Sequence, residues 1–152
     1  MTRLLEWLAT ASAAFFAGAA LYVSVVEHPA RMQAGVAVAL AEFRPSYKRA
    51  APVQASAAAI CLVSSVSVSL LTWEWAWALG GLLVGAAIPF TLLAIMPTNH
   101  RLLDTAATLP KYEAVSLLAR WGRLHWVRSI SSTGVLWFYC ARFFGGKGLT
   151  LL

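Results

Sequence analysis

Residues 4–26, LLEWLATASAAFFAGAALYVSVV, form an apolar run that decides how this chain is organised. A helix needs about 20 consecutive apolar residues to cross the hydrocarbon core of a membrane, and this run is long enough. It is also longer than the roughly 7 to 15 apolar residues of a secretory signal peptide. We therefore expect a retained membrane span, in which Glu6 lies close enough to one end to reach the interface.

The composition of the whole chain is typical of a protein dissolved in lipid. Its 152 residues are 60% hydrophobic and only 12% charged, whereas a soluble domain has about 25% charged residues. Twelve Lys and Arg against six Asp and Glu give a net charge of +6. Most of these basic residues lie in the connections between apolar runs, a pattern typical of topology signals and of lipid-headgroup contacts. We therefore expect membrane lipids as partners and no nucleic acid.

Three further apolar runs predict spans at about residues 50–73, 75–96 and 124–144. The stretches between spans one and two and between spans three and four are amphipathic, which favours interfacial helices; the second of these is expected to begin near Pro110. The predicted fold is all-α: a single domain over residues 1–152, built as an integral membrane four-helix bundle with interfacial helical connections.

Short-range signals define the second and third spans. Pro45 suits the first turn of the second helix. Only residues 72–75, TWEW, separate the two spans, which predicts an antiparallel hairpin. We expect its tryptophans and Trp77 to lie at the membrane interface. In the third span, Gly81 and Gly85 would let another helix approach closely, and Pro89 predicts a kink.

The last span opens with residues 121–132, WGRLHWVRSISS, which carry ionisable groups where a lipid-facing helix would carry leucine. Within this stretch, Trp121, His125, Arg128 and Ser132 follow one another at spacings of four, three and four residues. They therefore share one face of a helix. Ionisable residues at a membrane span are costly unless they meet a partner or water. The stretch therefore predicts a functional site.

Alternation of four spans gathers polar side chains on one side of the membrane. The end of span one, the start of two, the end of three and the start of four share that side, which includes all three histidines of the chain. Its polar residues are Glu27, His28, Arg44, Tyr47, Lys48, Asn99, His100, His125 and Arg128. The sequence therefore predicts that His28, Asn99, His125 and Arg128 converge in one pocket at the level of the interface.

The distribution of basic residues predicts the topology. Nine of the twelve basic residues fall on the same side, namely Arg31, Arg44, Lys48, Arg49, Arg101, Lys111, Arg120, Arg123 and Arg128. The excess of Lys and Arg in cytoplasmic loops then places both long connections in the cytoplasm and both termini outside, in a bacterial inner membrane.

Four motifs, taken in order, resemble those of the anthrone oxygenase-like family of small four-span membrane proteins. They are Val26-Glu-His-Pro29, Phe43-Arg-Pro-Ser-Tyr-Lys48, the stretch 89–99 (PFTLLAIMPTN) and Trp121-Gly-Arg-Leu-His-Trp-Val-Arg128. The fungal members oxidise anthrones to anthraquinones. The resemblance covers essentially the whole chain and maps residue by residue over Asn99, His125 and Arg128. It implies an oxygenase-type activity on a flat phenolic, anthrone-like or quinone-like substrate.

In the first functional hypothesis, the chain is a membrane oxidoreductase for such a lipophilic small molecule. His125 or His28 removes a proton, and Arg128 and Asn99 stabilise the oxyanion that then reacts with oxygen. The residues expected to bind the substrate are Glu27, Arg44, Tyr47, Gln54 and Trp121.

Several alternatives stay open. The site holds no cofactor, or His28 and His125 ligate a metal or haem, since imidazoles suit Cu, Fe and Zn. In a second class of function, the chain is a non-enzymatic membrane module that binds lipid, quinone, haem or a protein partner. His125 and Arg128 would then hold phospholipid headgroups, and a homo-oligomer is compatible with either class.

Overall fold

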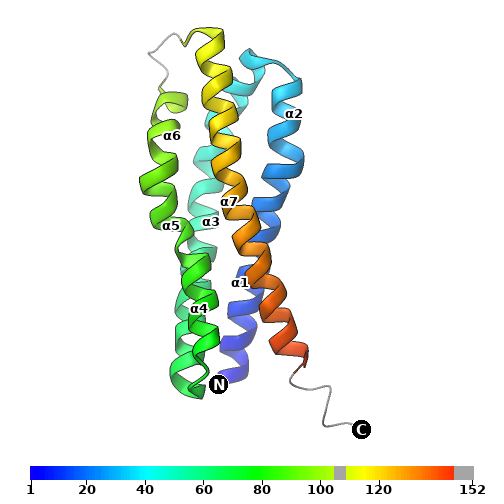
Figure 1. The fold of residues 1–152 in the computed structure, drawn as a ribbon, viewed down its shortest axis with the longest axis vertical. Helices are drawn as coiled ribbons and strands as arrows, with labels where there is room; N and C mark the ends of the chain where they lie inside the picture. Colours follow the sequence, from blue (N-terminus) through cyan, green and yellow to red (C-terminus); the bar gives the residue numbers. More distant parts are fainter. Residues whose placement is uncertain (105–108, 146–152) are drawn as a thin grey trace.

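The computed structural model describes residues 1–104 and 109–145, and within these ranges it contains helices and no strand. The described residues form four long helical segments (Figure 1). The first joins α1 (Thr2–Tyr22), η1 (Val23–Glu27) and α2 (His28–Gln33), and the second is α3 (Val36–Thr72). The third joins α4 (Trp75–Gly85), α5 (Ala87–Phe90), η2 (Thr91–Ile95) and α6 (Met96–Leu103), and the fourth is α7 (Lys111–Gly145). The prediction of an all-α fold is confirmed.

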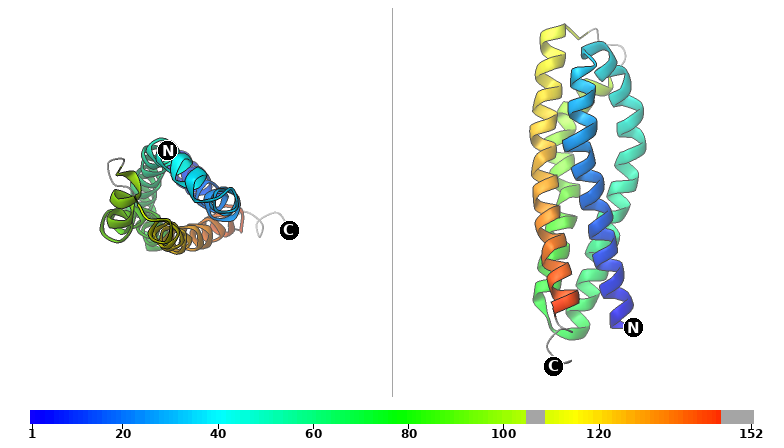
Figure 2. Two further views of the ribbon diagram at one scale, coloured as in Figure 1. Left: turned by 90° about the horizontal axis from the view of Figure 1, so that it is seen from above. Right: turned by 90° about the vertical axis from the view of Figure 1, so that its right-hand side faces the viewer.

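The four segments pack side by side in a closed ring. Helix α1 packs against α3 and α7, and α4 packs against the same two helices. Figures 1 and 2 show that the start of α1 and the end of α7 lie at one end of the molecule, together with the α3–α4 turn. The α2–α3 connection, the end of α6 and the start of α7 lie at the other end. The ring leaves an interior that all four segments can line.

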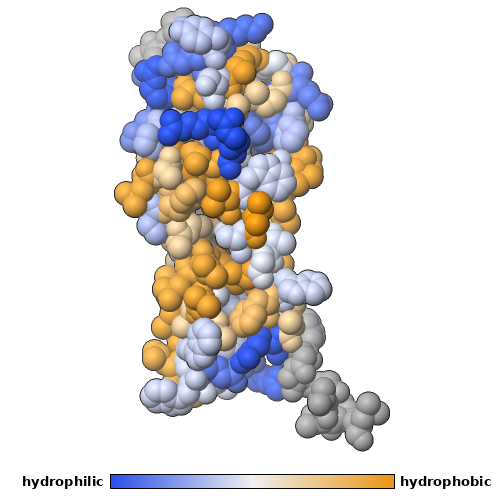
Figure 3. All heavy atoms as spheres, in the orientation of Figure 1, coloured by the Kyte–Doolittle hydropathy of each residue, from blue (hydrophilic) through white to orange (hydrophobic). Residues whose placement is uncertain are grey.

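Three of the segments are long and apolar enough to cross a membrane: Thr2–Gln33, Val36–Thr72 and Trp75–Leu103. Figure 3 shows apolar residues over the middle of the molecule and hydrophilic residues toward both ends. The fourth segment is as long, but His125, Arg128 and several serines dilute its apolar character. Residues 124–144 therefore stay a predicted span.

Two of the four segments contain a five-residue π-helical turn at the same position relative to a proline. Segment η1 is followed by His28 and Pro29, and η2 is followed by Met96 and Pro97. A proline has no N–H to donate to the preceding turn, so the backbone can widen there without losing a further bond. Single π-turns occur often at functional sites, and both of these contribute residues to the cavity described below.

In the half of the molecule nearer the chain termini, helices α3 and α4 pack closely where their residues are small, as predicted for Gly81 and Gly85. A β-carbon on Gly81 would lie 2.5 Å from the Ser65 β-carbon, and one on Gly85 would lie 3.0 Å from the Leu62 side chain. These glycines therefore let α3 approach α4, which is how helices associate in lipid. Trp77 does not contact lipid as the predicted interface anchor would, because its ring is buried and packs on Tyr139 at 4.8 Å.

The structure also corrects two boundaries. Helix α3 begins at Val36 and runs without a break through Pro45 and Pro52, so Pro45 is not in its first turn. Helix α7 begins just after Pro110, as predicted, but continues unbroken into the predicted span. Tertiary packing can hold a helix together across the one backbone bond that a proline removes. The third segment is interrupted at Ala86, close to the kink predicted from Pro89.

The buried apolar residues form two clusters, one toward each end of the molecule. The cluster nearer the termini includes Phe16, Trp77 and Tyr139, and the other includes Phe43 and Trp121. Residues of both clusters line a single cavity, so the cavity lies where the two cores meet.

Candidate functional site

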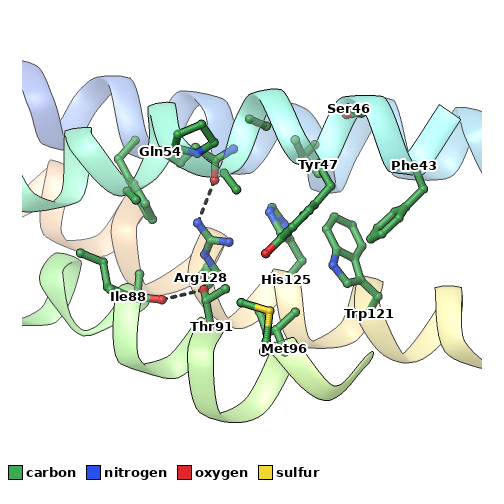
Figure 4. Close-up of a pocket in the computed structure, with 18 of the residues that line it drawn as sticks. Phe43, Ser46, Tyr47, Gln54, Ile88, Thr91, Met96, Trp121, His125 and Arg128 are labelled. Atoms are coloured by element: carbon green, nitrogen blue, oxygen red, sulfur yellow. Dashed lines mark hydrogen bonds between the residues drawn. The ribbon is translucent and has the colours of Figure 1, made fainter. Parts of the chain in front are cut away.

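A cavity of about 270 Å³ lies inside the ring of helices. This volume is just below the roughly 300–1,000 Å³ of typical small-molecule sites. Its wall is mostly apolar and aromatic, and the polar side chains in it come from all four segments. They are Glu27, Arg31, Ser46, Tyr47, Gln54, Thr91, Trp121, His125 and Arg128. Figure 4 shows Tyr47 from α3 and His125 and Arg128 from α7 pointing into the same space.

The His125 imidazole is buried, with 2% of its surface exposed, and it is fixed by serines. Its Nδ1 atom lies 2.9 Å from the Ser24 hydroxyl of η1, which in turn lies 2.8 Å from the Ser129 hydroxyl of α7. One face of the imidazole stacks on the Trp121 ring, with the ring centroids 4.8 Å apart. The packing and the hydrogen bond leave the imidazole little freedom to rotate.

Arg128 contributes a positive charge one helical turn below His125. Its Nη2 donates to the Gln54 side-chain oxygen at 2.8 Å, the contact drawn in Figure 4, and its guanidinium lies 5.3 Å from the centre of the Phe16 ring. In the part of the chain that the structure describes, its Nε–H has no hydrogen-bond partner. Arg128 therefore has no carboxylate partner among these contacts, and its charge is available to an anion in the cavity.

Tyr47 lies on the opposite wall, and Figure 4 shows its hydroxyl pointing into the space beside His125 and Arg128. The side chain of Asn99 lies near this hydroxyl. Asn99 itself lies behind the wall: its residue is fully buried and does not line the cavity. Among the described residues, neither atom of its side-chain amide makes a hydrogen bond. Buried amides are usually satisfied by protein or by ordered water, so Asn99 is placed to act on the cavity through Tyr47 or through water.

An ion cluster closes the end of the cavity near the long connections. Arg31, with 5% of its surface exposed, pairs with both Glu27 and Glu42, and Ser46 donates to Glu27 at 2.5 Å. The Arg31 guanidinium also lies 5.6 Å from the Trp121 ring. This cluster joins α2 and α3 and gives the cavity a second polar end.

Of the predicted substrate-binding residues, Glu27, Tyr47, Gln54 and Trp121 line the cavity. Arg44 does not, because its guanidinium donates to the backbone carbonyls of Leu102 and Asp104. These bonds tie α3 to the end of α6. Of the predicted catalytic residues, His125 and Arg128 line the cavity, whereas Asn99 and His28 lie outside its wall.

His28 lies close to the cavity but behind Trp121. Its ring centre is 5.3 Å from that of Trp121, and among the described residues its Nδ1 has no hydrogen-bond partner. The described residues contain no group of three or more His, Cys, Asp or Glu side chains that could hold a metal ion. A metal or haem held by His28 and His125 would therefore need its other ligands from side chains other than His, Cys, Asp or Glu.

Sequence reasoning missed Ser24, Arg31 and Ser129 as members of the site. For Arg31 a signal was present, because Glu27 and Arg31 are four residues apart and can pair on one helix face. The sequence gives no such signal for Ser24 and Ser129, since serine is common in apolar helices. There its hydroxyl usually donates to a backbone carbonyl of its own helix.

The family model described as anthrone oxygenase matches residues 43–137, more than half of the chain. The chain belongs to the anthrone oxygenase family. The match includes Tyr47, Gln54, Trp121, His125 and Arg128 of the cavity wall. It does not extend over Ser24, Glu27 and Arg31, which the first helical segment contributes to the cavity and its surroundings. No curated protein and no solved structure matched the chain significantly.

Proposed function

We propose that this chain is a membrane-embedded oxygenase that oxidises a lipophilic phenolic or anthrone-like molecule to a quinone. The observation that carries the proposal is that a buried imidazole and an arginine without a carboxylate partner among its described contacts line one largely apolar, aromatic cavity. Flat aromatic walls suit a polycyclic substrate, and the two polar groups suit proton removal and anion binding. Membership of the anthrone oxygenase family supports the same reaction class.

In the proposed reaction, His125 takes a proton from the activated carbon or the phenol of the substrate. The negative charge of the resulting enolate rests on an oxygen that Arg128 and Tyr47 can bind, which stabilises charge as it develops. The enolate carbon then bonds to O₂, which is the oxidant, and the peroxide takes back the proton. Loss of water leaves a new carbonyl, so one substrate and one O₂ give one quinone and one water.

The cavity wall supports access for a lipophilic molecule from the bilayer. Pro52 of α3 and Leu92 of η2 line the cavity and are also exposed at the outer surface, Leu92 to 57%. Helix α3 packs closely on α4 but makes few contacts with η2. An opening between α3 and η2 would lie on the apolar part of the surface, where a membrane-dissolved substrate is concentrated.

The test is oxidation of anthrone by the purified protein in lipid nanodiscs under ¹⁸O₂. We expect anthraquinone to form faster than in protein-free nanodiscs, with one labelled oxygen per product and one O₂ consumed per anthrone. Rates equal to the protein-free background for anthrone and for related phenols would overturn the proposal.

The second candidate is a non-enzymatic membrane module that binds a quinone or lipid, or haem. The ion cluster at Arg31 favours it, because a cavity with charged groups at one end and apolar walls suits an amphipathic ligand. Quinone or lipid bound without turnover of anthrone would support this candidate. Absorbance spectra and metal analysis of the purified protein would detect a haem or metal held by the histidines.

We also propose that the protein lies in a bacterial inner membrane, with the α2–α3 and α6–α7 connections in the cytoplasm. This orientation follows from the excess of Lys and Arg at that end. Single cysteines at Thr2 and at Thr108 should label from opposite sides of the membrane. Labelling of both from one side would contradict the orientation.

A further inference from the structure

We propose that Ser24 and Ser129 are positioning residues that hold His125 as the tautomer with its proton on Nδ1, so that an unprotonated Nε2 faces the cavity. The use of that Nε2 as a base rests on the proposed function, but the tautomer does not. The inference follows from counting protons along one buried chain of hydrogen bonds.

The chain runs from α7 to the first helical segment and back. His125 Nδ1 lies 2.9 Å from Ser24 Oγ, Ser24 Oγ lies 2.8 Å from Ser129 Oγ, and Ser129 Oγ lies 2.9 Å from the backbone carbonyl oxygen of Ala20. The three side chains are at most 4% exposed. Solvent therefore does not supply an alternative partner that could reverse a bond.

The Ala20 carbonyl sets the direction, because a carbonyl oxygen can only accept. Ser129 has a single hydroxyl proton and donates it to Ala20. If it donated to Ser24 instead, two oxygens 2.9 Å apart would face each other without a proton between them. Ser129 must therefore accept at the 2.8 Å contact, and Ser24 must donate there.

Ser24 has then used its only proton, so it can only accept from His125. The proton on His125 is thereby fixed on Nδ1. In the part of the chain that the structure describes, the other ring nitrogen has no hydrogen-bond partner, and the residue lines the cavity. The lone pair on Nε2 is thus presented to whatever the cavity holds, as a base or a hydrogen-bond acceptor needs.

The direct test is ¹⁵N NMR of the imidazoles in the intact, histidine-labelled protein in detergent micelles at neutral pH. The chain has three histidines, and the signal that disappears in His125→Gln belongs to His125. We expect a protonated, pyrrole-type Nδ1 and an unprotonated, pyridine-type Nε2. A proton on Nε2, or on both nitrogens, would overturn the inference.

Two variants then test the role of the serines. Ser24→Ala and Ser129→Ala each break the chain, so we expect the proton of His125 to move at least partly to Nε2, and anthrone oxidation to fall about tenfold or more. Ser131→Ala is the matched control, because Ser131 is an exposed serine of α7 that donates only to the Arg128 carbonyl. An unchanged His125 spectrum in a folded Ser24→Ala protein would contradict the positioning role. If the spectra behave as expected but the wild-type protein oxidises no anthrone, the proposed function fails and the tautomer stands.

Discussion

The imidazole of His28 lies directly over Gly122, at a place where every other residue type would put a β-carbon. The Cδ2 atom of the ring is 2.7 Å from the position that this β-carbon would take. The glycine thus lets α2 approach α7 at the level of Trp121, whose ring also contacts His28. This contact joins the first helical segment to the helix that carries His125 and Arg128.

Gly122→Ala should therefore disturb the site through His28. The added methyl must displace the imidazole and Trp121 behind it, and overpacking of this kind costs about 1–3 kcal/mol. We expect a lower unfolding temperature in detergent and slower anthrone oxidation. Gly134→Ala on the same helix is the control, because nothing lies within 4 Å of its β-carbon position. Equal stability of the two variants would show that the His28 contact is not tight.

Arg128→Lys separates a geometric role of Arg128 from a role that needs only its charge. Lysine keeps the charge but loses the planar fork that binds an oxyanion or carboxylate with two bonds. We expect turnover or ligand affinity to fall about 10- to 100-fold, which is about 1.4 kcal/mol for each factor of ten. Arg123→Lys, an exposed arginine of α7, should have no such effect. A headgroup or topology role would tolerate both changes alike, as measured by activity and quinone titration.

Arg31→Gln should destabilise the end of the protein at which α2 packs against α3. It would leave Glu27 and Glu42 without their common cation. Arg31 is buried but the two carboxylates are partly exposed, so the loss costs less than the roughly 3 kcal/mol of a fully buried pair and more than that of a surface pair. Arg101→Gln removes an exposed arginine from its pair with Glu113 and should leave the unfolding temperature nearly unchanged. Thermal unfolding of both variants in the same detergent makes the comparison. A neutral Arg31→Gln would mean that this cluster does not stabilise the fold.

The sequence predicted the fold well because lipid imposes a simple rule. An apolar run of about 20 residues crosses a bilayer as a helix, because its backbone groups must bond to one another. This rule shows directly in runs such as residues 4–26. The helix boundaries are harder to predict from the sequence. Pro45 and Pro110 are equally compatible with the start of a helix, but only Pro110 precedes one. Tertiary contacts, which a linear pattern does not contain, decide whether a helix continues through a proline.

The site was predicted less completely, for a related reason. Helical spacing placed Trp121, His125 and Arg128 on one face, and all three line the cavity. Spacing along the chain does not give the rotation of one helix relative to another, so it could not place His28 behind Trp121 or Asn99 behind Tyr47. Ser24 and Ser129 matter only because two helices bring them together across 105 residues of sequence.

The proposed role of His125 as the base in anthrone oxidation is tested most directly by one comparison of three proteins. Oxygen uptake with anthrone is measured for the wild-type protein, His125→Gln and His100→Gln, each shown to be folded by its unfolding temperature. Glutamine keeps hydrogen bonding but cannot take a proton near neutral pH, and His100 is an exposed histidine outside the cavity wall. We expect His100→Gln to match the wild type and His125→Gln to lose about 100-fold or more of the rate. Equal rates for a folded His125→Gln and the wild type would contradict this role.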